Sequence, residues 1–101
     1  MRIIWSPCAL ERAAEIADYI AEDNPSAAKK WITQLFEHVK KIEQFPESTR
    51  IVHELNDPTI REVVFKNFRI IYEIQNNCIN VLTVRRFRQQ LDLSEVTRVD
   101  N

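Results

Sequence analysis

Residues 61–90 are the stretch that most constrains how this chain can fold. They hold apolar runs rich in Val, Ile, Phe and Tyr, each about the length of a strand, with breaks at Lys66-Asn67 and Gln75-Asn76-Asn77. The chain has no glycine, and Asn is the next best residue for the left-handed positions of tight turns. The stretch therefore predicts three antiparallel strands joined by turns that depend on Asn67, Asn76 and Asn77.

Two amphipathic helices are predicted before this stretch. Apolar side chains recur at three- and four-residue steps in residues 10–20 and again in residues 28–42. Ser6-Pro7 and Asn24-Pro25 each offer a capping side chain followed by a proline suited to the first helical turn. Helices joined this closely form an antiparallel hairpin, and the predicted sheet is the partner that can cover their apolar faces.

The fold class follows from the order of these segments. A short strand is expected at residues 2–5, and another from Arg50 to about Leu55, before the three strands of residues 61–90. The order β-α-α-β-β-β indicates an α+β fold, with the helical hairpin packed on one face of an antiparallel sheet. At 101 residues the chain is expected to be a single domain, 1–101, in which residues 91–101 form a short helix or a tail.

A two-residue turn at Lys66-Asn67 would assign the side chains to the two faces of the sheet. Arg69 then falls on the face away from the helices, and residues 79–84 are apolar on both faces, as in a central strand. Because the hairpin can cover only one face, we expect the far face to be a docking site. The helix side is expected to hold Val63, Phe65, Phe68, Ile70, Tyr72 and Ile74.

Positive charge gathers on the predicted sheet. Residues 61–88 contain six Lys or Arg and two acids, a balance of +4 in a chain whose net charge is −1. A basic sheet beside acidic helices is typical of a surface that binds a partner. The candidate partner-binding residues are Arg61, Lys66, Arg69, Arg85, Arg86 and Arg88.

Several classes of function are disfavoured by composition. No apolar run approaches the roughly 20 residues that cross a bilayer, no export leader is visible, and a location in the cytoplasm is expected. Cys8 and Cys78 lack metal-ligand spacing, the absence of glycine disfavours a nucleotide-binding loop, and we expect neither a metal nor a cofactor. His38 and His53 have no pattern of a catalytic triad around them. A pI near 6.1 disfavours binding to an RNA backbone.

The sequence resembles the ParE/RelE superfamily of bacterial type II toxins over nearly its whole length. The resemblance is carried by the order of Ile4-Trp5-Ser6-Pro7, Tyr19–Pro25, Phe45-Pro46-Glu47, Asn67–Tyr72 and Val81–Arg85. It implies a small toxin that a cognate antitoxin holds inactive in the same cytoplasm. Operator DNA would be bound only indirectly, through the antitoxin.

The superfamily resemblance implies two different activities. RelE-like members cleave mRNA on the ribosome, and for that activity the candidate catalytic residues here would be Arg69, Arg85, Arg86 and Arg88. ParE-like members inhibit DNA gyrase by protein contact, without catalysis. The C-terminal Tyr or His often expected for proton transfer is missing from residues 86–90, and arginine is a poor acid or base. Gyrase inhibition is therefore favoured; an mRNA endonuclease and a non-toxic antitoxin-binding module are the alternatives.

Overall fold

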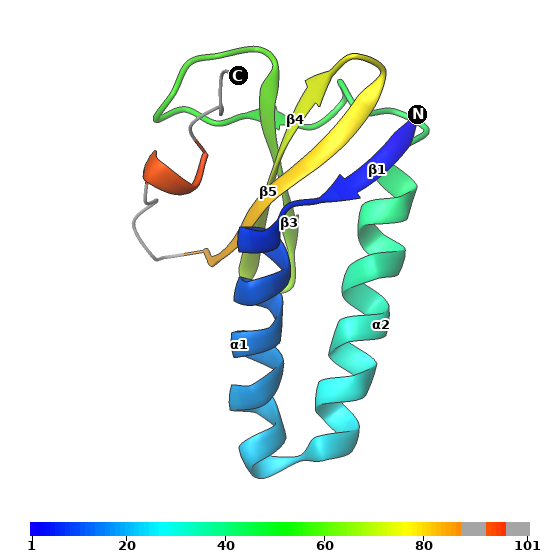
Figure 1. Cartoon of the computed structure of the whole chain (residues 1–101), viewed down its shortest axis with the longest axis vertical. Helices are drawn as coiled ribbons and strands as arrows, with labels where there is room; N and C mark the ends of the chain where they lie inside the picture. Colours follow the sequence, from blue (N-terminus) through cyan, green and yellow to red (C-terminus); the bar gives the residue numbers. More distant parts are fainter. Residues whose placement is uncertain (88–92, 97–101) are drawn as a thin grey trace.

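The structure is a computed structural model that describes residues 1–87 and 93–96. It contains one helical hairpin and a sheet, and Figure 1 shows the two helices extending side by side away from the strands. The expected α+β fold is confirmed. The elements are β1 (Arg2–Trp5), α1 (Pro7–Asp23), α2 (Pro25–Ile42), β2 (Arg50–Ile51), β3 (Ile60–Phe65), β4 (Phe68–Gln75), β5 (Cys78–Arg86) and the 3₁₀ turn η1 (Leu93–Glu95).

Both helices begin where the Ser-Pro and Asn-Pro pairs predict. The Ser6 side chain accepts a hydrogen bond from the Ala9 backbone N–H at 3.0 Å, and the Asn24 side chain accepts one from Ala27 at 3.1 Å. The Asn24 backbone N–H also donates to the Ile20 carbonyl, so this residue ends α1 and begins α2. A single residue between the two helices therefore makes the hairpin as tight as the sequence indicates.

The sheet has five strands in the order β1-β5-β4-β3-β2, and it is mixed. The expected antiparallel pairing is found between β2, β3, β4 and β5, whereas β1 differs from the expectation and lies parallel to β5. Strand β5 is therefore a central strand, and both of its faces are covered, since Ile79 and Val81 pack in the core under the helices and Leu82 packs against a second cluster on the other face. The strand expected from Arg50 to Leu55 ends at Ile51, because residues 53–56 form a turn in which Asn56 has a φ of 50°.

The expected hairpin register is confirmed, since Phe65 lies opposite Phe68 across β3 and β4. In this first turn the left-handed residue is Lys66, with a φ of 55°, and not Asn67 as expected. The second turn uses two residues, Asn76 and Asn77, whose φ values of 51° and 59° suit a type I′ turn. Both turns are therefore two residues long, and both are built without glycine.

The main core lies between the helices and the near face of the sheet. Tyr72 is fully buried there, and Trp31 of α2 packs edge-on against Phe68 with ring centroids 5.3 Å apart. The face assigned to the helices from sequence is confirmed residue by residue. Val63, Phe65, Phe68, Ile70, Tyr72 and Ile74 all belong to this core or pack against it.

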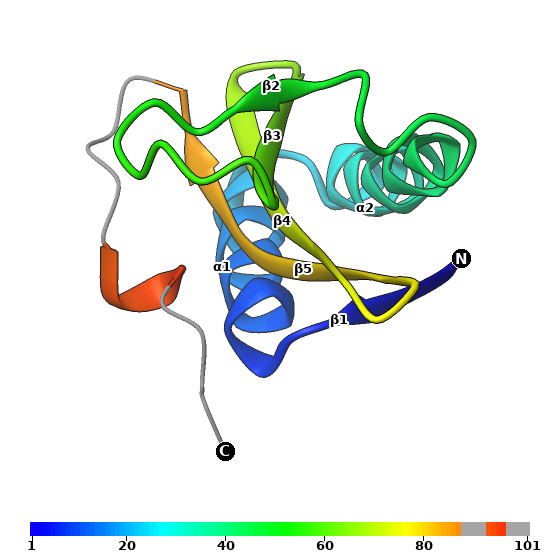
Figure 2. The same cartoon turned by 90° about the horizontal axis from the view of Figure 1, so that it is seen from above.

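The far face carries a second, smaller apolar cluster that the chain covers itself. Val52, Ile60, Ile71 and Val96 are buried together, so the loop after β2 and the turn η1 both pack on this face. Figures 1 and 2 show η1 on the opposite side of the molecule from α2. The expectation of a wholly uncovered far face is therefore wrong for this part. No helix among the described residues is both long and apolar enough to span a bilayer.

Candidate functional site

Arg69 lies at the centre of a buried ion network on the far face of the sheet. Its Nε and Nη2 donate to the two oxygens of Glu62, each at 2.8 Å, and its Nη1 and Nη2 donate to the two oxygens of Glu54, each at 3.0 Å. The side chains of Arg69 and Glu62 are only 7% and 3% exposed. The hydrogen bonds that Arg69 donates to Glu62 and Glu54 raise the pKa of Arg69, and both carboxylates neutralise its charge locally.

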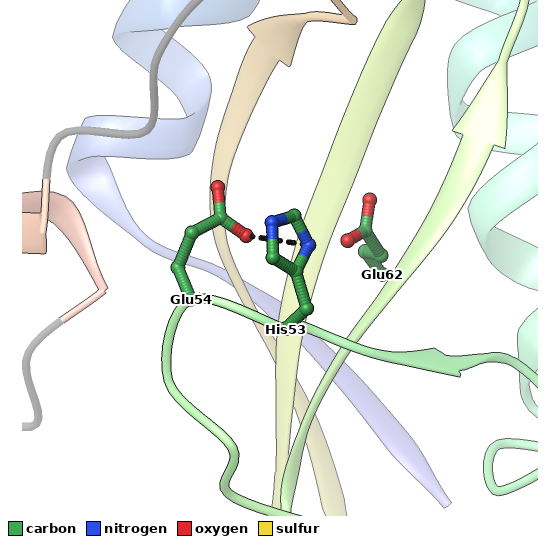
Figure 3. A group of neighbouring side chains, drawn as sticks. All are labelled: His53, Glu54 and Glu62. Atoms are coloured by element: carbon green, nitrogen blue, oxygen red, sulfur yellow. Dashed lines mark ion pairs between the residues drawn. The ribbon is translucent and has the colours of Figure 1, made fainter.

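Two further side chains border this network. The Arg50 Nη2 lies 3.2 Å from Glu62 Oε2, and the His53 Nδ1 lies 3.2 Å from Glu54 Oε1 (Figure 3). The hydrogen bond from Arg69 lowers the pKa of Glu54. Because His53 and Glu54 belong to the loop after β2, whereas Glu62 and Arg69 belong to β3 and β4, the network ties this loop to the sheet.

The same side chains could be taken for a metal site. Ligand atoms of His53, Glu54 and Glu62 lie within 4.8 Å of one another. Figure 3 shows the three side chains as neighbours. All four carboxylate oxygens, however, already accept hydrogen bonds from Arg69. A cation would have to displace the guanidinium group, so the arrangement is that of an ion-pair network.

The Arg61 side chain is also hydrogen-bonded within the protein. Its Nη1 donates to the backbone carbonyls of Glu47 and Thr49 at 3.0 and 2.8 Å, and its Nε donates to the carbonyl of Pro58 at 3.1 Å. These carbonyls belong to the two segments on either side of β2. Arg61 therefore fixes the connection between α2 and β3.

Arg85 belongs to a second polar cluster, which holds η1 against the sheet. Its Nη1 lies 3.3 Å from Glu95 Oε2, and Glu95 also accepts hydrogen bonds from Arg12 of α1 at 3.0 Å and from Thr83 at 2.6 Å. Burial would raise the pKa of Glu95, but the hydrogen bonds from Thr83 and Arg12 and the charge of Arg85 outweigh it, and the pKa is lowered.

Lys66 and Arg86 remain at the surface. The Lys66 Nζ donates to the side-chain oxygen of Gln34 at 2.6 Å, and the Arg86 guanidinium lies 5.3 Å from the ring centroid of Tyr19. Neither cation forms an ion pair with any residue in 1–87 or 93–96. Arg88, the sixth basic candidate, lies outside the described residues.

These two cations line a surface depression that we call the Phe87 groove. It consists of two hollows that meet at Phe87, which lines both, and their volumes are about 700 and 410 Å³. The larger hollow, at the turn between β3 and β4, is lined by Val64, Lys66, Asn67, Phe68, Arg86 and Phe87. The smaller one is lined by Arg50, Ile51, His53, Glu62, Arg69 and Phe87.

The apolar part of this groove was not predicted from the sequence. The predicted candidates are all basic, whereas Ile51, Val64 and Phe87 are large apolar side chains exposed at the surface. Strand alternation places Val64 beside Arg69 on the far face, which is a usable signal. Arg50 was missed because its position beside Phe87, with the guanidinium 5.9 Å from the ring centroid, depends on long-range packing.

Comparisons with known proteins identify the fold and the family. A family model described as the ParE toxin of the type II toxin-antitoxin system parDE matches residues 3–91. A solved structure described as the chromosomal ParDE TA system from P. aeruginosa superposes with a TM-score of 0.72, at 21% identity, over 85% of this chain and 95% of that chain. The isolated E. coli RelE toxin superposes with a TM-score of 0.59, at 14% identity, over 94% of this chain and 93% of that chain.

At these identities the two solved structures show a shared fold, whereas the family model shows membership. The comparison with curated proteins gave no match. The matched residues 3–91 include both helices, strands β2 to β5, all of β1 except Arg2, and both tight turns. The chain therefore belongs to the ParE toxin family of type II toxin-antitoxin systems.

Proposed function

We propose that this chain is neutralised by a cognate antitoxin in the cytoplasm and that, once free, it inhibits DNA gyrase by protein contact. Family membership and the likeness to a structure described as a ParDE TA system support the antitoxin as a partner. The choice of gyrase over ribosome-bound mRNA depends on the chemistry available at the far face of the sheet.

The observation that decides this choice is that the Arg69 side chain is already hydrogen-bonded within the fold. Cleavage of RNA needs cations that can hold the scissile phosphate and a group that can move a proton near neutral pH. All three guanidinium nitrogens of Arg69 already donate to Glu54 or Glu62. An approaching phosphate would meet two carboxylates beside this arginine, and like charges repel. Arg69 is therefore suited to hold the fold, and poorly suited to bind a phosphate.

The remaining surface charge supports the same choice. Arg61 and Arg85 are also used within the fold, which leaves Lys66 and Arg86 as the described sequence candidates directed to solvent. A protein that binds a nucleic-acid backbone gains its affinity by neutralising many phosphates. A few cations around exposed apolar side chains are better matched to a protein surface.

The proposal is tested by a supercoiling assay with purified gyrase, relaxed plasmid and excess chain. We expect supercoiling to be inhibited, while relaxation by topoisomerase I at the same chain concentration proceeds normally. That second reaction is the control for binding to the DNA itself. Undiminished supercoiling at excess chain would count against gyrase as the target.

Each of the two alternative functions predicts a different experimental result. Codon-positioned cleavage of message on translating ribosomes would replace the proposal with an mRNA endonuclease. Induced expression of the chain without an antitoxin is expected to arrest growth. Continued growth at a confirmed level of folded protein would instead indicate a non-toxic antitoxin-binding module.

A further inference from the structure

We infer that the Phe87 groove is the surface by which this chain contacts gyrase, and that it receives an acidic segment of gyrase bearing a large apolar side chain. The inference rests on the proposed function for the identity of the partner. The chemistry of that segment is derived from the groove alone.

The floor of the groove calls for an apolar anchor. Phe87, Ile51 and Val64 are 47%, 41% and 38% exposed, although each is a large apolar side chain. Exposed apolar side chains that gather around one depression are typical of an interaction site. The larger hollow, at about 700 Å³, falls within the range of about 300–1,000 Å³ typical of ligand pockets. It therefore has room for an inserted side chain.

The rim of the groove calls for carboxylates. Arg50, Lys66 and Arg86 surround the apolar floor, and no acid among residues 1–87 and 93–96 lines the larger hollow. The acid that lines the smaller one, Glu62, is 3% exposed and already paired with Arg69. The larger hollow therefore presents unbalanced positive charge from Lys66 and Arg86 beside apolar surface, whereas the charge of Arg50 in the smaller hollow is partly balanced by Glu62. An acidic partner segment complements it, and a basic segment would be repelled.

Phe87 is held in place before any partner arrives. Its backbone N–H donates to the Asn67 carbonyl at 2.7 Å, which fixes the end of β5 against the turn between β3 and β4. The Arg50 guanidinium lies 5.9 Å from the centroid of its ring. The position of the Phe87 backbone is therefore set before binding, and aromatic residues are common among those that dominate protein interfaces.

A peptide segment fits this groove better than two other occupants. Single-stranded nucleic acid stacks its bases on aromatic rings along a strongly basic groove. Here the exposed floor includes the aliphatic side chains of Ile51 and Val64, which offer no ring for stacking. A second copy of the chain in a symmetric dimer would bring the same patch against itself. Its cations would then face the cations of the partner copy.

The inference is tested with two variants of the groove and one matched control. Phe87→Ala removes the anchor, and Arg86→Glu reverses a rim charge on an exposed side chain. Lys30→Glu, at an exposed position of α2 outside the groove, makes the same charge reversal. We expect each groove variant to raise the half-inhibitory concentration in the supercoiling assay, and the Kd for gyrase, about tenfold or more. Lys30→Glu is expected to change both by less than about twofold.

Thermal melting of all three variants checks that they are folded. If Phe87→Ala does not fold, Arg86→Glu still tests the inference. Groove variants that inhibit and bind gyrase as well as the wild type would overturn this inference and leave the proposed function standing. A wild-type chain that neither inhibits nor binds gyrase would overturn both.

Two further measurements address the other occupants. The first measures binding of a 15-nucleotide oligo-uridine. If both groove variants lose this binding and still bind gyrase as before, the groove is a nucleic-acid site. A dimer in sedimentation that the groove variants convert to monomer would assign it to a second copy. Either result would overturn the inference.

Discussion

Replacing Arg69 with methionine is expected to cost about 3 kcal/mol of unfolding free energy. The substitution leaves the Glu62 carboxylate, 3% exposed, with Arg50 as its remaining cation at 3.2 Å. Breaking a buried ion pair typically costs about 3–5 kcal/mol, because it leaves an uncompensated charge. We expect the lower end of this range, since Arg50 persists and since Glu54, 27% exposed, can be hydrated.

The expected loss is large enough to measure by melting. Unfolding entropy of about 2.1 cal/mol/K per residue gives roughly 0.2 kcal/mol/K for a chain of this length. A loss of about 3 kcal/mol then lowers Tm by about 15 °C. Urea denaturation followed by circular dichroism would give the free energy directly. Arg86→Met is the matched control, and we expect it to change stability by less than about 0.5 kcal/mol because Arg86 is exposed.

A double variant separates the buried charge from lost packing. Replacing Glu62 with leucine together with Arg69→Met removes both charges from the interior, and most of the lost stability should return. A loss below about 1 kcal/mol in Arg69→Met, or a double variant no more stable than the single one, would refute the assignment of Arg69 to a desolvated ion network.

Three further predictions concern other parts of the fold. Hydrogen bonds and nearby guanidinium groups outweigh burial and lower the pKa of Glu95, so its stabilisation is present above the unfolded pKa and is lost as pH falls through the folded one. The stability difference between wild type and Glu95→Gln, measured in urea, is expected to be positive at pH 7 and to shrink as the pH falls below the ordinary pKa of Glu, about 4.3. A constant difference would contradict this. Burial, with the charge of Lys41, lowers the pKa of His38, so NMR titration is expected to give a midpoint below the ordinary value of about 6.5 and stability should fall as pH decreases through that range. Asn77→Ala is expected to cost about 1 kcal/mol in chemical denaturation, because Asn77 has a φ of 59°, and an unchanged midpoint would count against a type I′ turn.

The parts of the fold that local chemistry determines could be predicted from sequence. Ser6 and Asn24 cap their helices because each side chain bonds a backbone N–H only three residues further on. The opposition of Phe65 and Phe68 follows from a two-residue turn, and it fixes which face every later side chain of the hairpin occupies. These interactions span a few residues, so the pattern of residue types is enough to predict them.

The features that escaped prediction depend on contacts between distant segments. Glu54 comes from a loop that meets Arg69 fifteen positions further along the chain, and no periodicity indicates that contact. Val96 is buried against the far face although the segment around it has few apolar residues. The expectation of an open far face failed for this reason. Strand alternation shows which face a side chain occupies, and it does not show what else in the chain will cover that face.

The contrast between Arg85 and Arg86 explains why a count of charges overstates the binding surface. Arg85 lies directly opposite Arg69 across β4 and β5, a pairing of like charges that is unfavourable unless acids intervene. Glu62 and Glu95 supply those acids, so both arginines are taken up by the fold. Arg86, one residue on, falls on the other face opposite Phe68 and meets the ring of Tyr19. Much of the positive charge of residues 61–88 therefore stabilises the sheet. The surface left beside Phe87 carries few cations among apolar side chains, and such a surface suits a protein partner better than a phosphate backbone.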